Sequence, residues 1–154
     1  MEFAGTALCA GADDSCIPNR EAGVFSFLGE AAVVLLAVAA GGAIGAVLRY
    51  LLSGWVQGVG GARFPWGTLA VNVVGSFALG FLMAGLVGHA VAGGTTRTFW
   101  TIGVLGAFTT FSTFSYETLA LLAVGDWTAG MANVAANLGL GLAAALVGLR
   151  LGAL

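Results

Sequence analysis

Four long apolar runs constrain this chain more than any other feature of its sequence. A run of about 20 apolar residues is long enough to cross a lipid bilayer as one helix. We therefore predict an all-α membrane protein with four transmembrane helices, at about residues 31–54, 64–88, 99–124 and 128–152. The connections are short, so consecutive helices should run antiparallel. Tryptophans stand near the predicted helix ends, as in an aromatic belt, at Trp55, Trp66, Trp100 and Trp127.

The scarcity of charge supports this class and excludes others. Only 8% of the residues are charged, against about 25% in an ordinary soluble domain. The net charge is −2 and the five basic residues are all arginines, so a basic patch for nucleic acid is not expected. Cys9, Cys16 and the single His89 offer neither a zinc-ligand spacing nor a nucleophile beside a base. We expect a multi-pass protein of the cell membrane (inner or plasma membrane) that is not an enzyme.

Residues 1–30 differ from the rest of the chain. They hold five of the seven acidic residues, together with Pro18 and Arg20. Glu2 stands where a secretory signal would carry a positive charge, so no such signal is expected. We predict a poorly ordered polar tail at 1–30, followed by the transmembrane domain at 31–154.

Polar residues inside the predicted helices are the informative ones, because they are costly in lipid. Thr68, Asn72 and Ser76 recur every four residues and so share one helical face, as do Asn133 and Asn137. Such stripes either join helices through hydrogen bonds or line a hydrated path. The sequence leaves both interpretations open.

The third run contains the segment "GAFTTFSTFSYE", residues 106–117, which combines five hydroxyl side chains with phenylalanines at three-residue spacing. We predict a helix broken in mid-membrane here, where freed carbonyl groups can coordinate a cation. The electropositive edge of a phenylalanine ring can face an anion. The alternative is a buried aromatic cluster whose hydroxyls bond to the carbonyl four residues earlier. These two interpretations also remain open.

Three motifs resemble those of the Fluc (CrcB-type) fluoride channels: "GGAIGAVLRYLLS" at 41–53, "GTLAVNVVGSFALG" at 67–80 and "GVLGAFTTFSTFSYE" at 103–117. "NVAANLGLG" at 133–141 is a weaker match. Together they cover about residues 31–150, and the TTFSTF block is the specific part.

The resemblance implies a fluoride-selective channel whose passive efflux lowers cytoplasmic fluoride and protects against its toxicity. It also implies an antiparallel, dual-topology homodimer with two pores and a structural sodium ion (Na+) at the interface. Its roles fall on these residues: Phe111, Phe114, Asn72, Ser112, Thr113 and Ser115 along the pore, the backbone carbonyls of Gly106 and Thr109 on sodium, and Arg49 and Glu117 as structural or field-setting groups.

The distribution of arginine agrees with dual topology. Four spans place Arg20, Arg97 and Arg150 on one side of the membrane, with Arg63 and Arg49 towards the other. Orientation follows the Lys/Arg bias of the loops, and three against two favours neither orientation strongly.

Two rival functions stay open. A small proton-coupled exporter needs a titrating carboxylate within the membrane, and Glu117 is the one candidate. A purely structural membrane protein would tolerate apolar replacement of Phe111 and Asn72.

Overall fold

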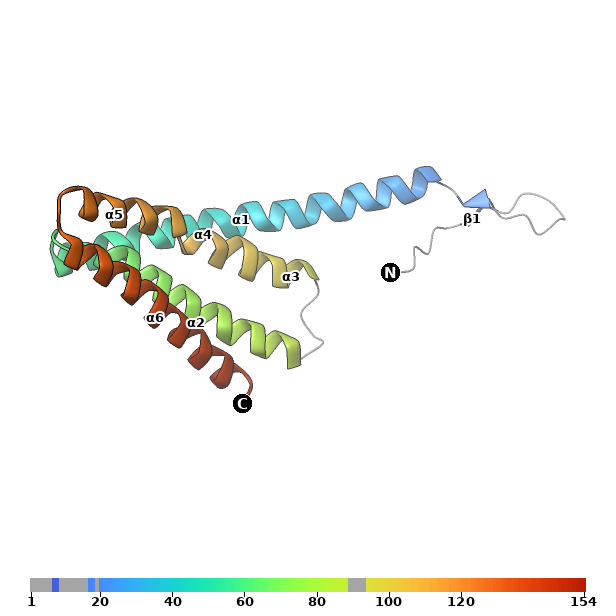
Figure 1. Cartoon of the computed structure of the whole chain (residues 1–154). Helices are drawn as coiled ribbons and strands as arrows, with labels where there is room; N and C mark the ends of the chain where they lie inside the picture. Colours follow the sequence, from blue (N-terminus) through green and yellow to red (C-terminus); the bar gives the residue numbers. More distant parts are fainter. Residues whose placement is uncertain (1–6, 9–16, 19, 89–93) are drawn as a thin grey trace. The chain divides into compact units, whose positions relative to one another are not determined.

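The computed structural model describes residues 7–8, 17–18, 20–88 and 94–154 (Figure 1). Cys9, Cys16 and His89 lie outside these residues. Two short strands pair antiparallel near the N-terminus, β1 (Ala7–Leu8) with β2 (Ile17–Pro18). The other elements are helices, in the order α1 (Arg20–Gly60), α2 (Trp66–Gly88), α3 (Gly94–Thr98), the π-helix η1 (Phe99–Leu105), α4 (Gly106–Phe108), α5 (Phe111–Ala123) and α6 (Trp127–Gly152). The predicted all-α class with a broken third span is confirmed.

Three of the described helices are long and apolar enough to cross a membrane, over Leu28–Gly60, Trp66–Gly85 and Trp127–Gly152. The expected span at 99–124 is divided among η1, α4 and α5, so it contains no single long helix. Many large apolar side chains point outward, and Leu36, Leu51 and Leu142 are 70%, 59% and 72% exposed. Lipid, rather than water, is the solvent that such a surface fits.

The chain divides into two compact units, residues 1–36 and 37–154. The division falls inside α1, which extends beyond the predicted span 31–54 at both ends. The division at residue 30 and the order of the tail stay predictions. All the site residues considered below belong to the unit 37–154.

Helices α2 and α6 run parallel and in close contact (Figure 1). Asn72 bonds to Asn137, and Gly80 packs against the backbone of Ala145, so residue numbers rise together along the two helices. This is the arrangement expected of the second and fourth of four alternating spans. Glycine permits the approach, because a Cβ atom on Gly80 or Gly148 would collide with a carbonyl oxygen of the other helix.

Helix α1 approaches η1 in the same way. A Cβ atom on Gly41 would lie 2.7 Å from the carbonyl oxygen of Phe99, and one on Gly45 would collide with the carbonyl of Val104. The small-residue pair Gly41 and Gly45 is therefore a helix contact. Gly42, one residue along, has nothing within 4 Å of its Cβ position, so it lies on a different face.

These contacts predict a difference between two glycines of α6. Gly148→Ala should lower the thermal stability of the protein in detergent, because overpacking typically costs about 1–3 kcal/mol. Gly139→Ala is the matched control, since nothing lies within 4 Å of its Cβ position. Equal melting temperatures for the two variants would contradict the tight α2–α6 contact.

Candidate functional site

The third span is interrupted at Thr109 and Thr110. Both residues have extended backbone, with φ −84° and ψ 159° at Thr109 and φ −150° and ψ 114° at Thr110. Thr110 then caps the start of α5, since its Oγ1 accepts a hydrogen bond from the N–H of Thr113 at 3.2 Å. A threonine hydroxyl at this position satisfies one of the N–H groups that a helix start leaves unpaired. The break is thus encoded locally by the threonine pair.

Asn72 of α2 holds the break from the neighbouring helix. Its Oδ1 accepts the N–H of Thr110 at 2.9 Å, and its Nδ2 donates to the carbonyl of Thr110 at 3.2 Å. The side-chain amide therefore binds both backbone polar groups of one residue. Buried backbone groups need such partners, above all in a membrane. Asn72 supplies them where the helix does not.

Two of these hydrogen bonds, one to Asn72 Oδ1 and one to Thr110 Oγ1, leave two backbone carbonyl groups without their helical donors. In a continuous helix the N–H of Thr110 would donate to the carbonyl of Gly106, but here it donates to Asn72. Likewise the N–H of Thr113 would donate to the carbonyl of Thr109, but it donates to the Thr110 hydroxyl. The carbonyls of Gly106 and Thr109 are therefore both separated from their helical donors.

A chain of hydrogen bonds leads away from Asn72 into the protein. Asn72 Nδ2 donates to Asn137 Oδ1 at 2.9 Å, and Asn137 Nδ2 donates to Asn133 Oδ1 at 2.9 Å. Asn133 Nδ2 donates to the hydroxyl of Thr118 at 2.9 Å, which donates to the carbonyl of Phe114 at 2.8 Å. Asn133 is 0% exposed. The Asn133–Asn137 stripe therefore joins α6 to α5 and α2.

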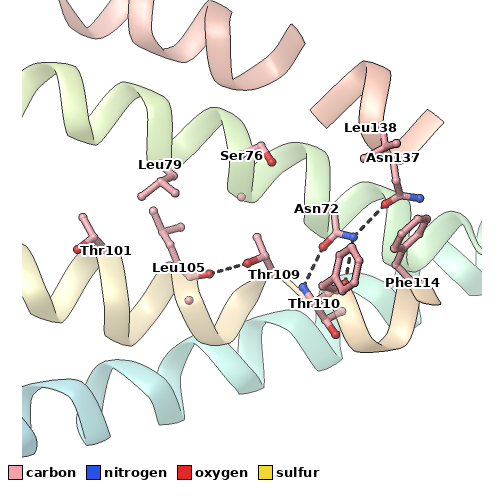
Figure 2. A pocket seen from close by; sticks show the side chains of 13 residues that line it. Asn72, Ser76, Leu79, Thr101, Leu105, Thr109, Thr110, Phe114, Asn137 and Leu138 are labelled. Atoms are coloured by element: carbon pink, nitrogen blue, oxygen red, sulfur yellow. Dashed lines mark hydrogen bonds between the residues drawn. The ribbon is translucent and has the colours of Figure 1, made fainter. Parts of the chain in front are cut away.

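A groove of about 290 Å³ opens beside the break (Figure 2). Its wall is formed by α2, the broken span and α6, with Asn72 and Asn137 bonded to each other at one side. The lining residues are Asn72, Gly75, Ser76, Leu79, Thr101, Leu105, Gly106, Thr109, Thr110, Phe111, Phe114, Asn137 and Leu138. Apolar walls with a few polar groups are typical of a ligand or ion site.

Phe111 and Phe114 both line this groove, but they differ in exposure. Phe111 is 76% exposed and Phe114 is 8% exposed. Their ring centroids lie 5.5 Å apart and their planes are inclined at 57°. Tilted ring pairs of this kind place the electropositive edge of one ring towards the other more readily than a parallel stack does. Phe114 also belongs to the packed core, whereas Phe111 does not.

The other three hydroxyl residues expected along the pore lie outside the groove. Ser112 Oγ is 3.2 Å from Thr110 Oγ1, and Thr113 Oγ1 accepts a hydrogen bond from Thr110 Oγ1 at 3.0 Å. Ser115 Oγ donates to the carbonyl of Phe111 at 2.9 Å and borders an adjoining apolar depression. Their roles along a pore stay a prediction.

Arg49 and Glu117 lie on other sides of the same region. Arg49 lines a cavity of about 250 Å³ together with Thr68, Thr110 and Thr113. Glu117 Oε1 accepts the hydroxyl of Thr68 at 2.8 Å. Glu117 Oε2 is buried and has no hydrogen-bond partner among the residues that the structure describes. The Thr68–Glu117 bond therefore ties α2 to α5 one turn beyond Asn72.

Four polar groove residues were not among the site residues predicted from the sequence, namely Ser76, Thr101, Thr110 and Asn137. Ser76, Thr110 and Asn137 belong to a polar stripe or to the TTFSTF block, which could have indicated them, whereas Thr101 belongs to neither. What the sequence does not give is the contact between Asn72 and Asn137, which lie 65 positions apart.

The fold and the groove define a small multi-pass membrane protein with a groove of mixed apolar and polar lining at a broken span. Within the described ranges no group of three or more His, Cys, Asp or Glu residues is placed to hold a metal ion. Any cation at the break would have to be held by other groups, such as the backbone carbonyls.

Comparison with known proteins identifies the family of this membrane protein. The sequence model of the family described as "CrcB-like protein, Camphor Resistance (CrcB)" matches residues 36–149. The "Fluoride-specific ion channel FluC" of Rhizobium meliloti (strain 1021) is 47% identical over 117 residues, which cover 76% of this chain and 94% of that protein. A protein of the same description from Thermus thermophilus is 50% identical, with 76% and 91% covered. The chain belongs to the CrcB/Fluc family of fluoride channels.

Proposed function

We propose that this protein is a fluoride-specific ion channel that lets fluoride leave the cell passively. The observation that carries the proposal is the groove at the break, where Asn72, Thr109 and Thr110 stand beside two phenylalanine rings. The names of the FluC relatives agree with it. The predicted location in a cell membrane and the absence of enzymatic machinery follow from the same family membership.

Fluoride is small and strongly hydrated, so a pathway must provide hydrogen-bond donors that replace its water. Moving an isolated ion into an apolar medium costs tens of kcal/mol by idealised Born solvation. Donors must therefore follow one another closely along the path. Asn72 and the hydroxyls of Ser112, Thr113 and Ser115 are the candidate donors. Both amide protons of Asn72 and the hydroxyl proton of Ser115 are donated within the protein, so these groups would exchange those hydrogen bonds for fluoride as it passes. The edges of Phe111 and Phe114 add weak positive potential. Chloride is larger and fits such a narrow track less well.

Fluoride flux from liposomes tests the proposal directly. Purified protein in liposomes should release fluoride down its gradient, with chloride release at least about tenfold slower. The fluoride rate should persist when the pH gradient is abolished, because a channel needs no proton coupling. Fluoride release that stops without a pH gradient would favour the exporter, and no release under any gradient would favour a structural role.

We further propose that the working unit is an antiparallel homodimer. Phe111 is 76% exposed in the single chain although it lines the groove, so a second copy can complete the wall. The outward face of α1 at Gly42 offers room for close helix packing. Cross-linking in membranes should give dimers, and monomers alone under conditions that support flux would count against this arrangement.

A sodium ion fits the break in such a dimer. The carbonyls of Gly106 and Thr109 are separated from their helical donors, and two copies would bring four such oxygens together. Hard oxygen donors without a thiol or imidazole suit a small hard cation. The bound cation would offset the carbonyl dipoles and raise the local potential for anions. A structure solved in sodium should show density on the two-fold axis, and an unbroken helix at 106–110 would refute the site.

A further inference from the structure

The side chain of Gln57 makes three hydrogen bonds along the connection between α1 and α2. Gln57 Nε2 donates to the carbonyl of Gly61 at 2.6 Å and to that of Phe64 at 3.0 Å. Gln57 Oε1 accepts the N–H of Gly67 at 3.0 Å. Both amide protons are thus used, and the bonds reach the beginning of the connection, its far side and the first turn of α2.

Backbone and ring contacts also shape this connection: the N–H of Trp66 donates to the carbonyl of Phe64 at 2.9 Å, and the ring centroids of Phe64 and Trp66 lie 4.6 Å apart. Gly61 has φ +83°, a left-handed conformation that glycine adopts without strain. The three bonds of Gln57 join backbone groups on both sides of Arg63. They fix the backbone of the connection from which the exposed Arg63 side chain extends.

Arg63 borders a pocket of about 320 Å³ that is lined by residues of the α1–α2 connection and of α5. The other lining residues are Gln57, Ala62, Phe64, Pro65, Tyr116, Glu117, Ala120 and Leu121. Arg63 is exposed and has no ion-pair or hydrogen-bond partner among the described residues. Glu117, the carboxylate that borders the same pocket, is engaged by Thr68 through one oxygen. No ion pair joins Arg63 to Glu117 among the described residues, so the guanidinium remains unpaired at the rim of a pocket that also holds this carboxylate.

We propose that Arg63 attracts fluoride to the mouth of the pathway and that Gln57 is the positioning residue that keeps it there. The proposal rests on the proposed channel function. Its physical basis is that a fixed charge beside a low-dielectric wall raises the local concentration of the opposite ion. Polar residues continue inward from the pocket, because Glu117 bonds to Thr68, which borders the Arg49 cavity, and that cavity shares Thr110 with the groove.

Ionic strength provides the diagnostic readout. The Debye length is about 30 Å at 0.01 M and about 8 Å at 0.15 M, so attraction by one charge is felt mainly at low salt. We expect Arg63→Gln to slow fluoride flux about two- to threefold at 0.01 M and hardly at all at 0.15 M. An effect of about two- to threefold is what one unit charge produces on an ion several ångströms away in water. Arg63→Lys should restore the low-salt rate. Arg97→Gln is the matched control, since Arg97 lies on α3 and its Nη2 contacts Met83 Sδ at 3.7 Å.

The role of Gln57 follows from a second pair of variants. Gln57→Leu keeps Arg63 but removes all three bonds, so it should reproduce the salt-dependent loss of Arg63→Gln. The double variant should lose no more than either single variant, because both changes act on one interaction. If Gln57→Leu fails to assemble, Gly61→Ala perturbs the same connection through its backbone and should give the same pattern.

The outcomes separate this inference from the channel function. Absence of fluoride flux in the unaltered protein would reject the channel itself. Wild-type rates for Arg63→Gln at both salt concentrations would overturn the role of Arg63 alone. Equal losses at both concentrations would mean that the pocket needs Arg63 for its structure, which also overturns the proposal. If the Gln57→Leu or Gly61→Ala protein shows the wild-type dependence of flux on salt, Gln57 is not the residue that positions Arg63.

Discussion

Asn72→Leu should lower fluoride flux by about 30-fold or more, the largest effect that we expect of a single polar substitution. Leucine removes three hydrogen bonds, to the N–H and carbonyl of Thr110 and to Asn137 Oδ1. Each partner left unpaired destabilises the broken conformation relative to a continuous helix by about 1–3 kcal/mol, and about 1.4 kcal/mol corresponds to a tenfold change in the population of that conformation. The N–H of Thr110 is then expected to return to the carbonyl of Gly106, which closes the break.

Flux in liposomes measures this effect, and the oligomeric state in detergent shows whether the protein still assembles. Val74→Ala on the same helix is the control, since Val74 is 48% exposed and does not border the groove. It should retain the wild-type rate. An assembled Asn72→Leu protein that conducts fluoride normally would show that the break does not need its partner from α2.

The membrane fold could be predicted because lipid leaves few alternatives. Backbone groups must be satisfied internally in hydrocarbon, so long apolar runs become helices. The break was also predictable, because Thr109 and Thr110 carry hydroxyls able to cap a new helix and follow Gly106 closely. These are local properties, which a single sequence contains.

The details of the break depend on contacts between distant segments. The π-helix η1 lies where Gly41 and Gly45 bring the backbone of α1 against Phe99 and Val104. Nothing local to residues 99–105 predicts this conformation. Similarly, the sequence left the asparagine stripes between two interpretations, helix contact or hydrated path. For Asn133 the structure supports the helix contact, because this side chain is fully buried and hydrogen-bonded. Asn72 fits both interpretations, since it joins the helices and also borders the groove.

Phe111→Ile and Phe114→Ile should each slow fluoride flux by about two- to tenfold while the protein still assembles. Isoleucine keeps apolar bulk but removes the ring, whose electropositive edge is the proposed contact for fluoride. Oriented aromatic contacts are worth about 0.5–1.5 kcal/mol beyond their buried area, and about 1.4 kcal/mol is tenfold in rate. The two variants should differ in stability, because Phe114 is 8% exposed and Phe111 is 76% exposed. A lower melting temperature is therefore expected for Phe114→Ile alone.

This contrast separates electrostatics from packing. Loss of flux in Phe111→Ile cannot be assigned to a damaged core of the single chain, since that side chain is mostly exposed. Phe81→Ile is the aromatic control, because Phe81 is 45% exposed on α2 and stacks on Phe77 away from the groove. Each variant is measured singly in liposomes, with chloride alongside fluoride. Wild-type fluoride rates in both groove variants would mean that the rings only pack, and the aromatic-cluster interpretation of residues 106–117 would then be the correct one.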